Sequence, residues 1–320
     1  MKKRCTPAKR TKSAAAISTK RAAECPVVGI GASAGGLEAV TQLLKHLPAD
    51  TGMGFVLVQH LDPKHESAFT ALLSRITKMT VCEARDGLLV KLDHLYVIPP
   101  NKKMGIEQGT LRLLPRGDGG VLHSPVDYFF RTLAADQGGQ AIGIVLSGTG
   151  SDGTRGLEEI KAAGGITFEQ SKDSAKYAGM PSSAGASGCA DYVLPPDEIA
   201  AELLRVGHHP HLIPAQRVDK DSLLPIDGDE FKQICTLLRA HSGVDFSHYK
   251  VATLRRRISR RMVLQKLDML KAYVEYLRGH SAEVEALFQD ILMCVAGFFR
   301  DAKMLDLLKN KIFPKLLKSR

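Results

Sequence analysis

The chain has 320 residues, 44% of them hydrophobic and 24% charged, which is typical of globular protein and excludes disordered or collagen-like chains. This length favours about two domains. No apolar run approaches the ~20 residues of a membrane-spanning helix, and the basic start is not followed by the apolar segment of a signal peptide. The six cysteines show no CxxC spacing, which argues against a disulfide scaffold or zinc ribbon and favours the reducing cytoplasm.

The net charge of +10 is unevenly distributed along the chain. Residues 1–25 carry eight Lys/Arg and one Glu, and residues 226–320 carry 18 Lys/Arg and 11 Asp/Glu. The segment between them is mildly acidic. Because residues 1–25 lack hydrophobic periodicity, they predict a flexible basic tail that solubilises the chain. The alternative is an arm that binds an anionic surface or nucleic acid.

From residue 26, short apolar runs alternate with helical patterns, and the runs predict strands at 26–30, 55–58, 95–98, 142–146, 166–168 and 192–194. This alternation predicts an α/β domain over residues 26–206, with a doubly wound, mainly parallel sheet covered by helices on both faces. Two further runs, within residues 102–114, flank Gln108-Gly109-Thr110 and predict a hairpin at an edge of that sheet.

The pattern changes after residue 206. Residues 207–226 are rich in proline, histidine and polar residues and predict a solvated linker; its three histidines lack the Cys or Asp support of a metal site. From residue 227 to residue 320, apolar residues recur at helical spacing and no strand pattern is present. The sequence therefore predicts a small all-α domain after the α/β domain.

The segment Gly31-Ala-Ser33-Ala-Gly35 lies between the first predicted strand and a helical pattern. Such a turn either binds a phosphate at the helix N-terminus or presents a serine nucleophile in a Gly-x-Ser-x-Gly elbow. A dinucleotide site is disfavoured, because the next strand ends in Gln59-His60 and not in the acidic residue that binds ribose. The absence of a Gly-Lys-Ser/Thr sequence argues against a P-loop.

A serine nucleophile needs a base and an orienting carboxylate, and the sequence offers both. His60 follows the second strand, and Asp152 follows the strand at 142–146, just before a helical pattern. Because the carboxyl ends of parallel strands meet at one edge, Ser33, His60 and Asp152 are predicted to form a catalytic triad. Each residue alone has a simpler interpretation, as a helix cap or a loop histidine. The chain order Ser-His-Asp disfavours the α/β-hydrolase fold.

Over residues 26–206 the chain resembles the catalytic domain of the CheB chemotaxis methylesterases. The resemblance rests on the turn around Ser33, on Gln59-His60, and on the segments Gly148-Thr-Gly-Ser-Asp152-Gly and Gly179-Met-Pro181. The resemblance implies that Ser33 is the nucleophile, His60 the base and Asp152 the orienting carboxylate. It places the oxyanion hole near the backbone of Thr149 and in the turn after Ser33. Ala34 lies in that turn, at a position where the family usually has threonine. It also places His123 and Met180 in segments that line the cleft.

The resemblance further implies a cytoplasmic enzyme that hydrolyses glutamyl methyl esters on chemoreceptor helices, with glutamine deamidation as a second activity and no metal or cofactor. Family members usually begin with a receiver domain, and a basic segment of 25 residues cannot form one, so we expect a cleft that is constitutively open. A non-catalytic sensory adaptor that binds receptors through basic helices is the main alternative. A dinucleotide-dependent oxidoreductase is a third, disfavoured by His60.

Residues 227–320 resemble the N-terminal domain of the CheR receptor methyltransferases, on the segments 249–262 and Gly297-Phe-Phe-Arg-Asp301. The usual Asn-x-Thr before the second segment is absent. Only 19 residues follow Asp301, so S-adenosylmethionine binding is expected only with a further downstream domain, and the chain looks truncated.

The first of these segments holds a cluster of five arginines, Arg255, Arg256, Arg257, Arg260 and Arg261. On a helix, positions 256/260 and 257/261 share faces. We expect this patch to dock on acidic receptor helices, with a plain solvated face or an RNA-binding helix as alternatives. Nucleic acid is not expected as a partner, because aromatic residues do not alternate with the basic ones.

Overall fold

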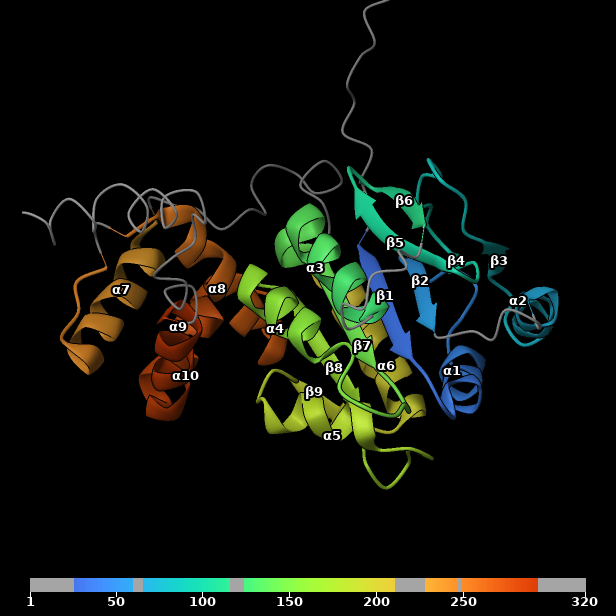
Figure 1. The fold of residues 1–320 in the computed structure, drawn as a ribbon. Helices are drawn as coiled ribbons and strands as arrows, with labels where there is room; N and C mark the ends of the chain where they lie inside the picture. The colour runs from blue at the N-terminus through green and yellow to red at the C-terminus, as the bar shows by residue number, and fades with distance from the viewer. Residues whose placement is uncertain (1–25, 60–65, 116–123, 211–227, 247–248, 293–320) are drawn as a thin grey trace, which may run out of the picture.

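A computed structural model describes residues 26–59, 66–115, 124–210, 228–246 and 249–292 (Figure 1). The main sheet has seven strands in the order β3-β4-β2-β1-β7-β8-β9, and all neighbouring strands are parallel. The strands are β1 (Val27–Ala32), β2 (Gly54–Gln59), β3 (Thr80–Glu83), β4 (His94–Val97), β7 (Ala141–Val145), β8 (Ile166–Gln170) and β9 (Tyr192–Leu194). The predicted doubly wound parallel sheet is confirmed, and β3 is an additional edge strand.

Helices cover both faces of this sheet. One face is packed by α1 (Gly36–Lys45), α2 (Glu66–Ser74) and α6 (Pro196–Gly207), and the other by α3 (Pro125–Gln137), α4 (Thr154–Ala163) and α5 (Gly179–Ala186). The continuously apolar strands bury side chains on both faces, as the sequence pattern requires. A three-residue 3-10 turn (Gly138–Gln140) joins α3 to β7.

Helix α3 approaches the central strand β1 closely. A Cβ added to Gly29 would lie 2.9 Å from Phe130 Cε1, and one added to Gly31 would lie 2.3 Å from Val126 Cγ1. The two glycines therefore make room for α3, whose N-terminus borders the region described below.

The predicted hairpin is present as β5 (Lys102–Glu107) and β6 (Thr110–Pro115), but its predicted place was wrong. It forms a separate two-stranded sheet and does not join the edge of the main one. The cause is its attachment to α3. Thr132 Oγ1 accepts a bond from the Ile106 N–H at 3.1 Å, and Asp136 accepts bonds from the backbone N–H groups of the turn.

Within residues 228–292 the described chain contains only helices, as predicted: α7 (Asp229–Ser242), α8 (Val251–Leu264), α9 (Leu270–Gly279) and α10 (Ser281–Leu292). Their apolar stripes meet in a separate core that includes Leu238, Ile258, Tyr273 and Leu287. Figure 1 shows these helices, coloured orange to red, on one side of the α/β domain beyond α4. In the described part of the chain, every helix is too short or too polar to cross a membrane.

Candidate active site

The candidate site lies at the carboxyl edge of the central strands β1 and β7. The chain runs outward from β1 to β2 and then returns to β7 on the other side of β1, so the strand order reverses between these two strands. Open α/β sheets bind ligands at such a switch point. The Gly-x-Ser-x-Gly turn and the loop that contains Asp152 both start there.

Ser33 is the first residue after β1, and α1 begins three residues later. Its backbone is fixed on both sides: its N–H donates to Ser147 O at 3.0 Å, and its C=O accepts from Gly36 N at 2.9 Å. Gly35 has a φ of +72°, and a Cβ there would lie 2.7 Å from Ser147 Oγ. Only glycine suits this position, so the elbow predicted from sequence is present as a tight strand-to-helix turn.

Ser147 joins three segments of the site, a role that no sequence pattern indicates. Its hydroxyl donates to Ala34 O at 2.9 Å and accepts from Tyr177 N at 3.0 Å. Its own N–H donates to Gln170 Oε1 at 2.8 Å. This buried serine thereby holds the elbow, the end of β7 and the loop before α5 in one arrangement.

Met180 and Gly148 border the elbow that carries Ser33. A Cβ added to Gly148 would lie 2.1 Å from Met180 Sδ and 3.0 Å from Ser33 Cβ. The Met180 N–H donates to Gly148 O at 2.9 Å. The adjacent Thr149 is exposed, and its Cα would lie 3.2 Å from a Cβ on Gly179. Of the predicted cleft residues, Ala34 is next to Ser33 in the chain, Met180 packs against Gly148 beside Ser33, and Thr149 follows Gly148. That they line a cleft stays a prediction.

Asp152 lies at the same edge, between β7 and α4, and is bound to the start of α3. Its carboxylate oxygens accept backbone N–H bonds from Val126 at 3.1 Å and Asp127 at 2.9 Å. Asp127 in turn accepts from the N–H groups of Gly153 at 2.9 Å and Gly156 at 2.8 Å. The two aspartates thus cap each other's helices, which fixes Asp152 and also gives it a structural role.

Burial raises the pKa of the Asp152 carboxyl to about 6, although the backbone bonds from Asp127 and Val126 favour the ionised form. A carboxyl that titrates this close to neutrality is unusual on a surface and frequent in functional clefts. Its charge would stabilise a neighbouring imidazolium.

Two predicted residues, His60 and His123, lie outside the described residues. Strand β2 ends at Gln59, which is in register with Ala32, and Gln59 Nε2 lies 3.4 Å from Ser33 O. The roles of the two histidines remain predictions from the sequence.

The predicted arginine docking face is wrong for two of its members. Arg257 is 0% exposed and Arg260 is 2% exposed, because both side chains enter the contact between α8 and the α/β domain. Arg261 is mostly buried and pairs with Glu283. Arg256 is exposed and Arg255 is half-buried, and for these two a docking role remains a prediction.

Comparison with known proteins agrees with this geometry. Residues 28–203 match the CheB methylesterase family, and residues 229–292 match the all-alpha domain of the CheR methyltransferases. The chain belongs to the CheB methylesterase family. The CheB methylesterase catalytic domain of Thermotoga maritima is a structural relative, with a TM-score of 0.54 and 30% identity, over 57% of this chain and 100% of that one.

Two curated relatives are matched over different lengths of this chain. A 104.1 kDa uncharacterized protein of Rhodobacter capsulatus is 36% identical over 265 residues, which are 77% of this chain and 28% of that protein. A protein-glutamate methylesterase/protein-glutamine glutaminase of Xanthomonas oryzae is 41% identical over 182 residues, 56% of this chain and 51% of the relative. The chain thus spans between about a quarter and about half of these relatives' lengths.

Proposed function

We propose that this chain hydrolyses the γ-methyl esters of glutamyl side chains on the cytoplasmic helices of chemoreceptors. The observation that carries the proposal is the position of Ser33: it lies on a tight elbow at the switch point of a CheB-type sheet, on the same edge as Asp152. The substrate class comes from relatives that are named protein-glutamate methylesterases.

In the proposed reaction, Ser33 Oγ attacks the ester carbonyl carbon while His60 accepts the serine proton. The tetrahedral intermediate collapses, the carbonyl–methoxy bond breaks, and His60 returns the proton so that methanol leaves. Water then attacks the acyl-enzyme by the same route in reverse, and this releases the glutamate and free Ser33. The reaction requires only side chains and water.

The geometry supports specific roles for the surrounding groups. Helix α1 begins three residues after Ser33, and the dipole at its N-terminus favours negative charge developing at the ester oxygen. The backbone near Thr149 is the proposed second source of oxyanion donors. Asp152, fixed by α3, is proposed to orient His60 and stabilise its cation. Glutamine deamidation would follow the same steps, with ammonia as the leaving group.

The proposal is tested by methanol release from a methylated chemoreceptor fragment. Ser33→Ala should reduce kcat by about 10⁴–10⁶-fold, as loss of a nucleophile does in other triad enzymes, while the far-ultraviolet circular dichroism spectrum stays unchanged. Asp152→Asn should also reduce kcat strongly. A Ser33→Ala variant that keeps a tenth or more of the wild-type rate would show that Ser33 is not the nucleophile.

The sensory-adaptor alternative receives less support. It requires the basic helices to be available to receptors, and the two arginines at the centre of the α8 cluster are buried inside the chain. A chain that binds the receptor fragment without releasing methanol would favour the adaptor.

A further inference from the structure

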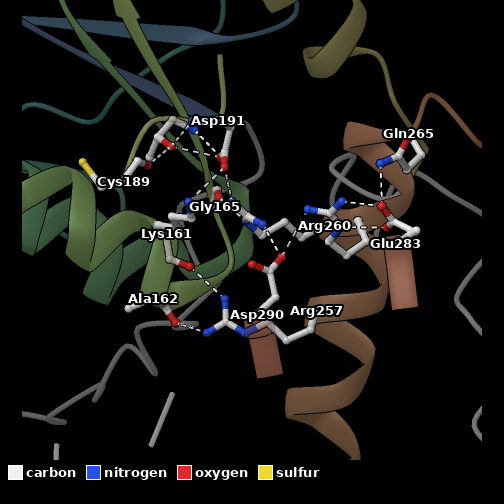
Figure 2. A network of polar contacts seen from close by, with 12 residues as sticks. Lys161, Ala162, Gly165, Cys189, Asp191, Arg257, Arg260, Gln265, Glu283 and Asp290 are labelled. Atoms are coloured by element: carbon white, nitrogen blue, oxygen red, sulfur yellow. Dashed lines mark hydrogen bonds and ion pairs between the residues drawn. The ribbon is translucent and has the colours of Figure 1, made fainter. Parts of the chain in front are cut away.

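The contact between the α/β domain and the helical domain is built around arginines that bind helix ends across the boundary. Figure 2 shows Arg257 extending from α8 to the end of α4, and Arg260 extending to Gly165 and Asp191. The residues in this contact are distant in sequence, and none of them takes part in the proposed hydrolysis.

Arg257 binds the C-terminus of α4. Its guanidinium donates to Lys161 O at 2.8 Å and to Ala162 O, two of the last carbonyls of that helix. The last carbonyls of a helix accept bonds from outside its regular ladder, and the dipole makes this end negative. Lys161 O also accepts the Gly164 N–H at 3.0 Å, so Arg257 adds a charged donor from the other domain to the backbone cap of α4.

Arg205 makes the reciprocal contact. It belongs to α6 of the α/β domain, and its guanidinium donates to Val263 O at 3.0 Å, one of the last carbonyls of α8. Glu202 and the Tyr192 hydroxyl hold this guanidinium in place. Val263 itself is fully buried and packs in the apolar core of the α/β domain. Each domain therefore supplies an arginine that caps a helix of the other.

Arg260 lies between these two caps and joins acidic groups of both domains. It pairs with Asp191 of the α/β domain and Asp290 of α10, and its Nε donates to Gly165 O at 3.1 Å. All three charged side chains are at most 7% exposed. Because such buried ions are costly unless fully paired, removing one partner is far more harmful than removing a surface pair.

The position of this contact relative to the candidate site follows from the strand direction. Residues 161–165 precede β8 and Asp191 precedes β9, so the helical domain is attached at the amino edge of the sheet. Ser33 and Asp152 lie at the carboxyl edge, at the opposite end of α4. The contact therefore leaves the site uncovered by the described helices α7–α10.

We propose that reciprocal arginine caps, Arg257 on α4 and Arg205 on α8, fix the helical domain to the esterase domain as one cooperative unit, with the catalytic edge left open. The end of α4 and Asp191 together form a surface that binds two arginines at i, i+3 spacing, Arg257 and Arg260. Its occupant is α8 of the same chain, so these arginines are not available to an acidic partner.

The test is calorimetric unfolding of the full chain, with Arg205→Ala/Arg257→Ala as the uncapped variant. Wild type should unfold in one transition with equal calorimetric and van't Hoff enthalpies. The uncapped variant should show two transitions, the helical domain melting first. The matched control is Arg278→Ala, which removes an exposed pair with Glu275 and an exposed bond to Gln233, both inside the helical domain, and should keep the single transition.

Hydrolysis of a small ester is measured separately, so that a failure of this proposal can be told apart from a failure of the proposed function. The uncapped variant should retain the wild-type kcat/KM within about twofold. Two independent transitions in wild type, or a variant that melts like the control, would overturn the proposal. If the uncapped variant does not fold, wild type and the single variant Arg257→Met decide the question. Methionine has neither the charge nor the donors of the cap, and an Arg257→Met chain with an unchanged melting temperature would also overturn the proposal.

Discussion

Ser33 and Asp152 occupy the ends of neighbouring strands, and this much was predictable from the sequence. Each follows an apolar run, and the carboxyl ends of parallel strands share an edge. The role of Ser147 was not predictable, because it depends on contacts with Ala34 and Tyr177, which are far away in sequence. Nor could the sequence indicate that the Asp152 carboxylate also caps α3.

The raised pKa of Asp152 predicts a measurable pH dependence of stability. Burial raises this pKa from 3.8 to about 6, so between these pH values the folded protein holds a proton that the unfolded chain has released. The stabilisation is fully present below about pH 4 and is lost as the pH rises through about 6. Two pKa units correspond to at most about 3 kcal/mol.

Asp152→Asn provides the comparison, because asparagine does not titrate. The free energy of unfolding of wild type should decrease relative to the variant between pH 4 and pH 7, as measured by urea titration at both values. A difference between the two proteins that stays constant with pH would show that the carboxyl titrates normally.

Ser147→Ala should destabilise the chain and impair catalysis together. The change removes the acceptor of the Tyr177 N–H and the donor to Ala34 O, two hydrogen bonds that each contribute about 0.5–1.5 kcal/mol to stability. It also frees the elbow from the loop before α5, so kcat on a small ester should fall more than KM changes. Ser187→Ala is the matched control, because Ser187 is exposed and its hydroxyl bonds to nearby residues of the same segment, Ala184 and Cys189. Equal behaviour of the two variants would remove Ser147 from the site.

At the level of elements, the long buried strands were predictable and the short polar one was not. Strand β3 reads Thr80-Val-Cys-Glu83, and none of its residues is fully buried, so it lacks both the apolar run and a clear alternation. It becomes a strand because β4 offers a partner. The hairpin β5–β6 was predicted from its turn, but its attachment to α3 depends on Thr132 and Asp136.

The turn after β7 and the start of α5 are packed tightly enough to make a specific prediction. Gly148→Ala would place a Cβ 2.1 Å from Met180 Sδ and 3.0 Å from Ser33 Cβ, so the Met180 side chain must move and Ser33 must give way by a few tenths of an ångström. Because a misplacement of about 1 Å at the reacting groups costs about 10²-fold, this smaller shift should reduce kcat on a small ester severalfold.

The double variant Gly148→Ala/Met180→Ala removes the clashing sulfur and should recover part of the lost rate. Gly279→Ala, where the added Cβ meets nothing within 4 Å, should leave activity unchanged. A Gly148→Ala chain with full activity would mean that Met180 and the elbow are not packed together as described.

For the whole molecule, the order of the two domains was predictable and their contact was not. From the sequence alone, the arginine cluster is interpreted as an exposed charged patch. The sequence does not show which carbonyls or carboxylates lie opposite the cluster. The structure places the C-terminus of α4 and Asp191 there. A cluster of charges can therefore be an internal contact when the acceptors come from another domain.

Arg256 remains exposed, so receptor docking through α8 can still be tested at this scale. If the helix guides acidic receptor helices to the enzyme, Arg256→Glu should lower kcat/KM on a receptor fragment severalfold at low salt and weaken its salt dependence. Hydrolysis of a small neutral ester should not change. Arg278→Glu is the charge-matched control; an equal loss in both variants would indicate a general charge effect and no docking site.

The central claim is that Ser33 is an activated nucleophile, and covalent labelling tests it most directly. The full chain is treated with a fluorophosphonate ester, and the modified residue is identified by peptide mass spectrometry. The account predicts about one label per chain, on Ser33, with labelling strongly slowed in Asp152→Asn. An unlabelled Ser33, or a label on another serine such as Ser147, would contradict it.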